Sequence, residues 1–268
     1  MTIFQALILG IIQGFTELLP ISSSAHLALT PWLLGWPDSG LAFDVALHLG
    51  TLIAIVGYFR EEWRRLILAA VSLAKKRRAD TPEEKRVVFL VIATIPAGIA
   101  GLLLEDAAET VFRSPLIIAT NLVVMGIVLW AVDRYMSRDR GIESMGWRDA
   151  MFVGLAQCLA LVPGVSRSGS TITAGRALKL RRESAAVFSF LLSMPITLAA
   201  VAFKLPDAVR EAESLVPLAV GVVAAALSAW VAIAVLLRYV ARHSYGVFAV
   251  YRLAFGALIF YLIHARGL

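Results

Sequence analysis

A short polar segment near the amino terminus carries the residue types of an activated nucleophile. It reads QGFTELLPISSSAH over residues 13–26. Gln13 and Glu17 stand four residues apart, and Ser23 and His26 three apart, so each pair would share one face of a helix. A carboxylate, a hydroxyl and an imidazole held together can activate an oxygen nucleophile. The alternative is that the serines only cap a second short helix, while Glu17 satisfies backbone donors.

A second polar segment, PGVSRSGST from Pro163 onward, has the chemistry of a phosphate cradle. Gly164 permits close backbone approach, and the amides at the start of a following helix would point at an anion. Arg167 adds a bidentate fork for phosphate oxygens. Further hydroxyl donors are Ser166, Ser168, Ser170 and Thr171. The lysine spacing of a P-loop is absent, and the alternative is a serine-rich loop with a snorkelling arginine.

Three more ionisable residues fall within apolar stretches, where such groups are costly and indicate function. Asp44 and His48 stand four apart near the start of one stretch. Asp44 is expected either to cap that helix or to face a cavity, and His48 either to bond a neighbour or to join it there. Arg252 would bind the anion or pair with a carboxylate such as Asp44 or Glu17, and we favour the structural pairing.

The composition indicates that these residues lie in a membrane protein. Of the 268 residues, 59% are hydrophobic and only 16% are charged, whereas soluble domains carry about 25% charge. This excludes a soluble enzyme, a disordered chain and a nucleic-acid binder. The single cysteine, Cys158, excludes an internal disulfide framework and is expected to be a packed thiol. Because the first basic residue is Arg60, no cleavable signal peptide is predicted.

Hydropathy predicts an all-α polytopic membrane protein with six spans and four re-entrant half-helices. A span needs about 20 mostly apolar residues. The six stretches that qualify are 43–59, 87–104, 115–132, 184–203, 215–237 and 246–264. Regions 3–36 and 148–180 each hold two short helical stretches around a proline-containing polar break. Such a break is tolerated at membrane depth only inside protein or beside water, so both regions are predicted to be re-entrant helix pairs.

The positive charges predict the orientation of these spans. Nineteen of the 25 lysines and arginines lie in the loops 60–86, 133–149, 176–183 and 238–243. Only four lie in 105–113, 204–213 and the carboxyl-terminal end. The first set is therefore predicted to be cytoplasmic and both termini to be outside. The first re-entrant pair then opens outward and the second inward.

That arrangement predicts one membrane domain, residues 1–268, made of two inverted halves of about 1–135 and 147–268 with a cytoplasmic linker. The sequences Gly-Ile-Ile-Gln from residue 10 and Gly-Leu-Ala-Gln from residue 154 each begin twelve residues before a serine, Ser22 or Ser166. The next span starts at a similar offset, at Phe43 and Phe188. The two polar tips should meet near the midplane. Acid–base groups opposite an anion cradle indicate phosphoryl chemistry on an amphiphile with an apolar tail.

Both polar segments resemble the signatures of the undecaprenyl-diphosphate phosphatase family, the BacA/UppP type linked to bacitracin resistance. Gln13 and Glu17 match its (E/Q)xxxE motif, residues 20–26 match its PxSS…H stretch, and residues 163–171 match PGxSRSxxT. The resemblance implies hydrolysis of undecaprenyl diphosphate to the monophosphate, which recycles the lipid carrier for peptidoglycan and other envelope polymers. It also implies a divalent cation, Mg²⁺ or Ca²⁺, and a site open to the outer face of the bacterial cytoplasmic membrane.

The resemblance also assigns roles to residues. Ser23 would attack the terminal phosphoryl group, with His26 and Glu17 aiding proton transfer or holding the cation. His26 as the nucleophile is the competing assignment. Diphosphate binding and charge stabilisation fall to Arg167, Ser166, Ser168 and Thr171, supported by Gln13, Ser22 and Gly164. Gln13 stands where some members have Glu, and a glutamine can hydrogen-bond phosphate or water but cannot neutralise a cation or act as a base. Gln13 is therefore not expected to be an essential metal ligand, and Glu17 becomes the expected metal carboxylate.

Two other functional classes share features with this sequence. Lipid-phosphate phosphatases of the acid phosphatase type also use a Ser-Arg pair, but their pattern requires a histidine at the position of Thr173. A transporter or flippase for a polyprenyl phosphate stays open, because an inverted repeat with a midplane site is the usual transporter plan. The expected partners are a polyprenyl diphosphate and membrane lipids, with a homodimer as an open alternative and no nucleic acid.

Overall fold

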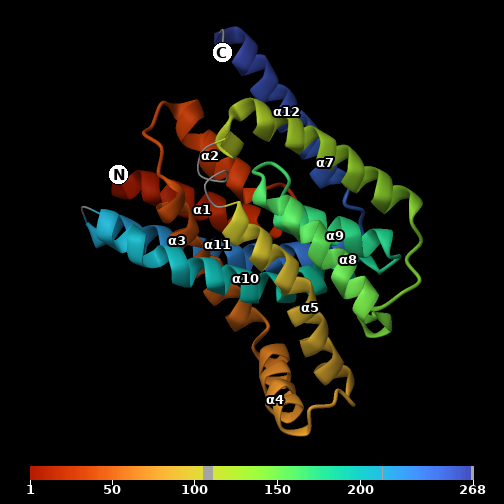
Figure 1. Cartoon of the computed structure of the whole chain (residues 1–268). Helices are drawn as coiled ribbons and strands as arrows, with labels where there is room; N and C mark the ends of the chain where they lie inside the picture. Colours follow the sequence, from red (N-terminus) through yellow and green to blue (C-terminus); the bar gives the residue numbers. More distant parts are fainter. Residues whose placement is uncertain (105–110, 213, 267–268) are drawn as a thin grey trace.

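A computed structural model describes residues 1–104, 111–212 and 214–266, and the regular elements of this part of the chain are helices joined by loops (Figure 1). The α-helices are α1 (Ile3–Leu18), α2 (Ser23–Leu34), α3 (Leu41–Tyr58), α4 (Arg60–Lys76), α5 (Pro82–Leu103), α7 (Pro115–Tyr135), α8 (Trp147–Cys158), α9 (Arg167–Ala177), α10 (Arg182–Glu211), α11 (Leu215–Val240) and α12 (Gly246–Arg266). Short 3₁₀ turns are η1 (Val111–Arg113), η2 (Ile142–Ser144) and η3 (Leu159–Leu161). Most of the predicted outer loop 105–113 lies outside the described residues.

Six of these helices are long and apolar enough to cross a membrane, which confirms the six predicted spans. They are α3, α5, α7, α10, α11 and α12. Their bounds differ from the predicted ones by a few residues, except that α10 continues to Glu211, beyond the predicted end at residue 203. The two regions with polar breaks each form two short helices, α1–α2 and α8–α9. The chain is therefore a multi-pass, all-α membrane protein.

The predicted loop 60–86 contains a helix, α4, which was not predicted because the segment is rich in charged residues. Its exposed face is apolar at its centre, with Ile67 and Leu68 about 60% and 58% exposed, while Leu66 and Ala69 on the opposite face are buried. Arginines and lysines at both ends keep it below the hydropathy of a span. The Glu84 carboxylate at the start of α5 accepts a 2.7 Å hydrogen bond from Ser72 Oγ, which fixes α4 against α5. The pair projects from the body of the molecule (Figure 1).

The short helices pack against spans from the other end of the chain. Helix α1 lies along α11, and α8 lies along α5 (Figure 1). These contacts are close because they are made at glycines. A Cβ placed on Gly10 would lie 2.2 Å from the Gly221 carbonyl oxygen, and one on Gly154 would lie 2.6 Å from the carbonyl oxygen of Ala93. Any larger residue would push the short helices away from their supports.

A buried ion cluster fixes the far end of α9. The Arg176 side chain is fully buried, and its Nε donates to Asp133 Oδ1 on α7 at 3.0 Å. Arg182 Nη2 and the Tyr245 backbone amide donate to Asp133 Oδ2 at 2.7 and 3.0 Å. One carboxylate thus joins α7, α9, α10 and the start of α12. Because two guanidinium groups and a backbone amide satisfy the Asp133 carboxylate, the cluster is a structural anchor. It lies at the end of α9 opposite Arg167.

Candidate active site

Two serines in the same unusual backbone conformation begin α2 and α9. Ser22 has φ 76° and Ser166 has φ 74°, in the left-handed region that costs a residue with a side chain about 1–3 kcal/mol. Each caps its helix: Ser22 Oγ accepts from the Ala25 amide at 3.4 Å, and Ser166 Oγ accepts from the Gly169 amide at 3.0 Å. The capping alternative is therefore confirmed for Ser22, and Ser166 caps its helix in the same way, a role that was not predicted from the sequence.

The two polar loops contact each other, as the sequence predicted. The Gly164 amide donates to Ser22 Oγ at 3.1 Å. In the other direction, Ser168 Oγ donates to the Leu19 carbonyl oxygen at 3.0 Å. Segments that are far apart in the chain thus form one site between the start of α2 and the start of α9.

Glu17 is the centre of this site. Its side chain is buried, and its Oε1 accepts from Arg167 Nη2 while its Oε2 accepts from Ser23 Oγ. Gln13 Nε2 also donates to Oε2, at 3.0 Å. His48 Nε2 lies 3.3 Å from the same oxygen. A carboxylate from α1 therefore joins a hydroxyl from α2, an imidazole from α3 and a guanidinium from α9.

The two terminal nitrogens of the Arg167 guanidinium bond two different helices. While Nη2 reaches Glu17, Nη1 donates to the Ser193 carbonyl oxygen at 3.1 Å and to Thr197 Oγ1, both on α10. The snorkelling alternative is wrong, because the head group is held inside the protein. Thr197 was not predicted from the sequence, although it is a polar residue within an apolar span, the same feature that identified His48.

His48 joins the site, whereas Asp44 does not. His48 Nδ1 lies 2.9 Å from the Asp44 carbonyl oxygen and donates to it, and Nε2 donates to the Glu17 carboxylate, because both partners can only accept. The Asp44 carboxylate instead accepts from Ser39 Oγ at 2.7 Å and from Arg113 Nη2 at 3.2 Å. The predicted cap is also wrong, because Gly40 is the residue that precedes α3.

Ser23 and His26 do not form the expected pair. Ser23 Oγ donates to Glu17, while both ring nitrogens of His26 have other partners. Nδ1 donates to the Ser22 carbonyl oxygen at 2.7 Å, and Nε2 lies 2.7 Å from the hydroxyl of Tyr251 on α12. The ring also stacks on Phe255 at a centroid distance of 4.7 Å. Tyr251 was missed, because its contact depends on how α12 packs against α2.

The remaining predicted hydroxyl donors serve the protein's own backbone. Thr171 Oγ1 donates to the Arg167 carbonyl oxygen at 2.7 Å and lies 2.7 Å from Ser189 Oγ on α10. Ser168 Oγ bonds the first loop, as described above, and also lies 3.2 Å from Ser166 Oγ. Thr171 therefore links α9 to α10 through Ser189, and its contact with substrate stays a prediction.

Arg252 pairs with neither predicted carboxylate. It is fully buried, and every hydrogen bond that its guanidinium makes in the described part of the chain goes to a backbone carbonyl oxygen. The favoured pairing with a carboxylate such as Asp44 or Glu17 is therefore wrong, and the alternative of anion binding stays a prediction. Cys158 is a half-buried free thiol whose Sγ donates to the Gly154 carbonyl oxygen at 3.5 Å.

The oxygen atoms near Glu17 that could bind a metal suit a cation whose other ligands are water and substrate. No cluster of three or more His, Cys, Asp or Glu side chains that could hold a metal occurs in the described ranges. Beside the Glu17 carboxylate, however, Gln13 Oε1 is buried without any hydrogen-bond partner. Mg²⁺ commonly takes one or two protein oxygens and completes its shell with water and substrate phosphates. One carboxylate and one vacant amide oxygen suit that mode of binding.

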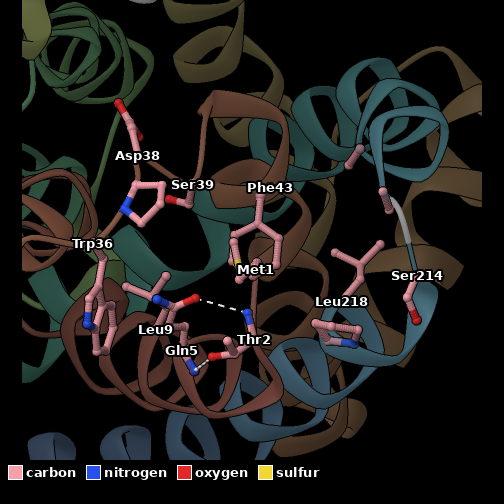
Figure 2. A pocket seen from close by; sticks show the side chains of 14 residues that line it. Met1, Thr2, Gln5, Leu9, Trp36, Asp38, Ser39, Phe43, Ser214 and Leu218 are labelled. Carbon is pink, nitrogen blue, oxygen red and sulfur yellow. Dashed lines mark hydrogen bonds between the residues drawn. The ribbon is translucent and has the colours of Figure 1, made fainter.

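Figure 2 shows a cavity of about 640 Å³ whose walls come from the start of α1, the α2–α3 connection, the end of α10 and the start of α11. Trp36 and Phe43 are among the lining side chains. Leu9 and Phe43 also belong to an apolar cluster that includes Leu27 and Leu47. None of the predicted site residues lines this cavity.

The chain is similar to known proteins over nearly its whole length. Residues 6–258 match the family described as Bacitracin resistance protein BacA. The chain is 64% identical over 266 residues to the undecaprenyl-diphosphatase of Gemmatimonas aurantiaca, covering 99% of this chain and 100% of the relative. It is 50% identical to that of Pelotomaculum thermopropionicum (99% and 98% coverage) and 48% identical to that of Moorella thermoacetica (97% of each). This chain therefore belongs to the bacitracin resistance protein BacA family.

Proposed function

We propose that this chain is a membrane phosphatase that hydrolyses undecaprenyl diphosphate to undecaprenyl phosphate and inorganic phosphate. The observation that carries the proposal is the Glu17 carboxylate, which accepts from Ser23 Oγ on one loop and from the Arg167 guanidinium on the other. The relatives named undecaprenyl-diphosphatase support the substrate. In the cell this reaction recycles the lipid carrier for cell-wall synthesis and confers resistance to bacitracin.

Ser23 is the nucleophile of the proposed reaction. Its Oγ attacks the terminal phosphorus while Glu17 Oε2 takes the hydroxyl proton, and the bond from that phosphorus to the bridging oxygen breaks. Undecaprenyl phosphate leaves with the bridging oxygen, to which Glu17 passes the proton and so returns to its ionised form. Water then attacks the phosphoserine and gives a proton to Glu17, which passes it to the Ser23 oxygen as that oxygen leaves and inorganic phosphate forms. Arg167 neutralises charge on the phosphoryl oxygens throughout.

His26 is assigned a supporting role on the basis of its contacts. Its Nδ1 is held by the Ser22 carbonyl oxygen, so only Nε2 could attack phosphorus, and Tyr251 occupies that nitrogen. The Ser23 hydroxyl, in contrast, already bonds a carboxylate that can act as its base. These contacts favour Ser23 over His26 as the nucleophile.

A divalent cation, Mg²⁺ or Ca²⁺, is proposed to bind at Glu17 and the unpartnered Gln13 Oε1. When bound, the ion would neutralise charge on the diphosphate oxygens. Gln13 contributes in a second way, because its Nε2 donates to Glu17 Oε2 at 3.0 Å and so orients the carboxylate. An uncharged Gln13 can perform both tasks without acting as a base.

The proposed topology is an inverted repeat in which α1–α2 and α8–α9 are re-entrant pairs, each followed by three spans. Three correspondences support it: the matched capping serines, the matched close contacts at Gly10 and Gly154, and the packing of α1 on α11 and of α8 on α5. The concentration of basic residues on one set of loops supports outer termini. From the resemblance to the undecaprenyl-diphosphate phosphatases, we also propose that the active site opens to the outer face of the bacterial cytoplasmic membrane.

Phosphate release from a polyprenyl diphosphate by the purified protein in detergent tests the function. We expect release that needs a divalent cation, stops with EDTA and falls about 100-fold or more in Glu17→Gln and Ser23→Ala. Ser24→Ala is the matched control, because Ser24 Oγ contacts only Ser22 Oγ among the described side chains. No release from folded wild-type protein would contradict the phosphatase and favour a transporter that binds the same lipid.

A further inference from the structure

Arg252 is a buried cation in the middle of a membrane span without a carboxylate partner. Its side chain is 0% exposed, and no ion pair of Arg252 occurs among the described residues. A charge in such a place is costly unless hydrogen bonds satisfy it. The other fully buried arginine, Arg176, meets this requirement with Asp133. Arg252 must meet it in another way.

The guanidinium of Arg252 bonds the backbone of both polar loops at once. Nη1 donates to the Pro20 carbonyl oxygen at 3.1 Å. Nη2 donates to the carbonyl oxygens of Gly164 at 2.6 Å and Val165 at 3.1 Å. Pro20 lies two residues before Ser22, and Gly164 lies two residues before Ser166. One planar head group therefore holds the peptide units just ahead of both capping serines.

Helix α7 provides the remaining hydrogen-bond acceptors of the Arg252 guanidinium. Arg252 Nε donates to the Leu122 carbonyl oxygen at 3.2 Å, and Nη2 also lies 3.3 Å from that of Asn121. Asn121 Nδ2 donates in turn to the Pro163 carbonyl oxygen at 3.1 Å, a second tie to the same loop. Space for the arginine depends on a glycine, since a Cβ on Gly169 would lie 2.9 Å from Arg252 Nη1.

These bonds act where the loops are strained. The left-handed conformations of Ser22 and Ser166 persist only if their surroundings fix them. Ser23 and Arg167 directly follow the two serines, so the direction of each loop sets where their side chains point. We propose that Arg252 is the positioning residue that holds both loops so that Ser23 and Arg167 converge on Glu17. The catalytic consequence rests on the proposed phosphatase function, whereas the structural consequence does not.

Lysine cannot replace this arginine. An ammonium group has three donors on one atom, whereas the guanidinium has five in a rigid plane that reaches carbonyl oxygens on three segments. The test therefore compares Arg252→Lys and Arg252→Met with Arg176→Lys, a matched control at a buried arginine anchored away from Glu17. We expect Arg252→Lys to lower kcat about tenfold or more with KM changed less than about threefold, since small misplacements of reacting groups cost that much. Arg176→Lys should lower the melting temperature with kcat within about threefold.

Hydrogen exchange of the backbone amides gives a readout that does not need activity. In Arg252→Lys, exchange should rise in both 19–25 and 162–169, and in Arg176→Lys it should rise in neither. A normal kcat in folded Arg252→Lys would overturn the proposal, and so would a lowered kcat with unchanged exchange in the two loops. If the wild-type protein releases no phosphate, the proposed function fails, and the exchange data still decide whether Arg252 holds the loops.

Discussion

Arg167 and Glu17 form an ion pair between the two polar loops, joining the start of α9 to the end of α1. The other arm of the guanidinium bonds Ser193 and Thr197 on α10. Arg167 thus shares Glu17 with Ser23, the proposed nucleophile, and an incoming phosphate would have to compete with Glu17 for the guanidinium. One terminal nitrogen of an arginine can exchange its partner while the other keeps its hydrogen bonds. A lysine has a single nitrogen and cannot do this.

Arg167→Lys should therefore lower kcat/KM about 100-fold, the loss typical of removing a donor to a charged transition state. The measurement is steady-state phosphate release, with circular dichroism and gel filtration to confirm folding. Thr197→Val, which removes only one acceptor from the fixed arm, should cost about tenfold or less. Equal activity of Arg167→Lys and wild type would mean that the guanidinium is not a substrate ligand.

The contacts of Ser23 and His26 predict which residue carries the phosphoryl group. Because Ser23 bonds the Glu17 carboxylate and His26 is held by Tyr251, a covalent intermediate should form on the serine. Rapid quenching with a polyprenyl diphosphate labelled on the terminal phosphate should trap an acid-stable adduct that disappears in Ser23→Ala. An acid-labile adduct that persists in Ser23→Ala and is lost in His26→Asn would assign the attack to histidine.

His48 should act on the reaction through Glu17. Its Nε2 lies 3.3 Å from Glu17 Oε2 and its Nδ1 is fixed by the Asp44 carbonyl oxygen. Glutamine can place an amide donor toward the same oxygen, so His48→Gln should keep most of the activity. His48→Leu should lower kcat/KM about tenfold or more, since a hydrogen bond to a charged group contributes about 1.5–3 kcal/mol. Phosphate release by both variants is the measurement, and equal losses would contradict the role.

Sequence patterns could predict the spans and the two loops because those features depend on local composition. Long apolar runs cross the membrane as helices, whereas Pro20 and Pro163 stand among polar residues and mark breaks. Proline alone is not sufficient, since Pro96 and Pro195 lie inside α5 and α10. Glu17, Ser23 and Arg167 stood out as polar residues in apolar surroundings, and the structure brings all three together.

The partners of those residues could not be predicted, because they depend on how helices from distant parts of the chain pack. Nothing near Ser23 in the sequence indicates that Glu17 is closer to it than His26. The five carbonyl partners of Arg252 are backbone atoms, which no side-chain pattern identifies. Helix α4 was missed for the opposite reason, since its terminal charges masked an apolar face.

Close helix contacts at glycines give a stability test of the fold. Gly10→Ala and Gly154→Ala would each place a methyl group against a backbone carbonyl, at 2.2 and 2.6 Å, and should destabilise the protein by about 1–3 kcal/mol. Gly98→Ala is the matched control, because it lies within α5 with nothing inside 4 Å of the added carbon. Alanine favours helix there, so the control should be neutral or slightly stabilising. The measurement is thermal unfolding in detergent, and similar melting temperatures for all three variants would contradict the packing.

The proposed inverted topology places the ends of the two short-helix pairs on opposite sides of the membrane. Asp38, which follows α2, and Arg181, which follows α9, both have exposed side chains suited to labelling. In a Cys158→Ala background, a membrane-impermeant maleimide should label Asp38→Cys in intact cells. Arg181→Cys should be labelled only after the membrane is opened, because its loop belongs to the basic, cytoplasmic set. Labelling of both from the same side would exclude inverted halves, since an inverted repeat requires α1–α2 to open outward and α8–α9 inward.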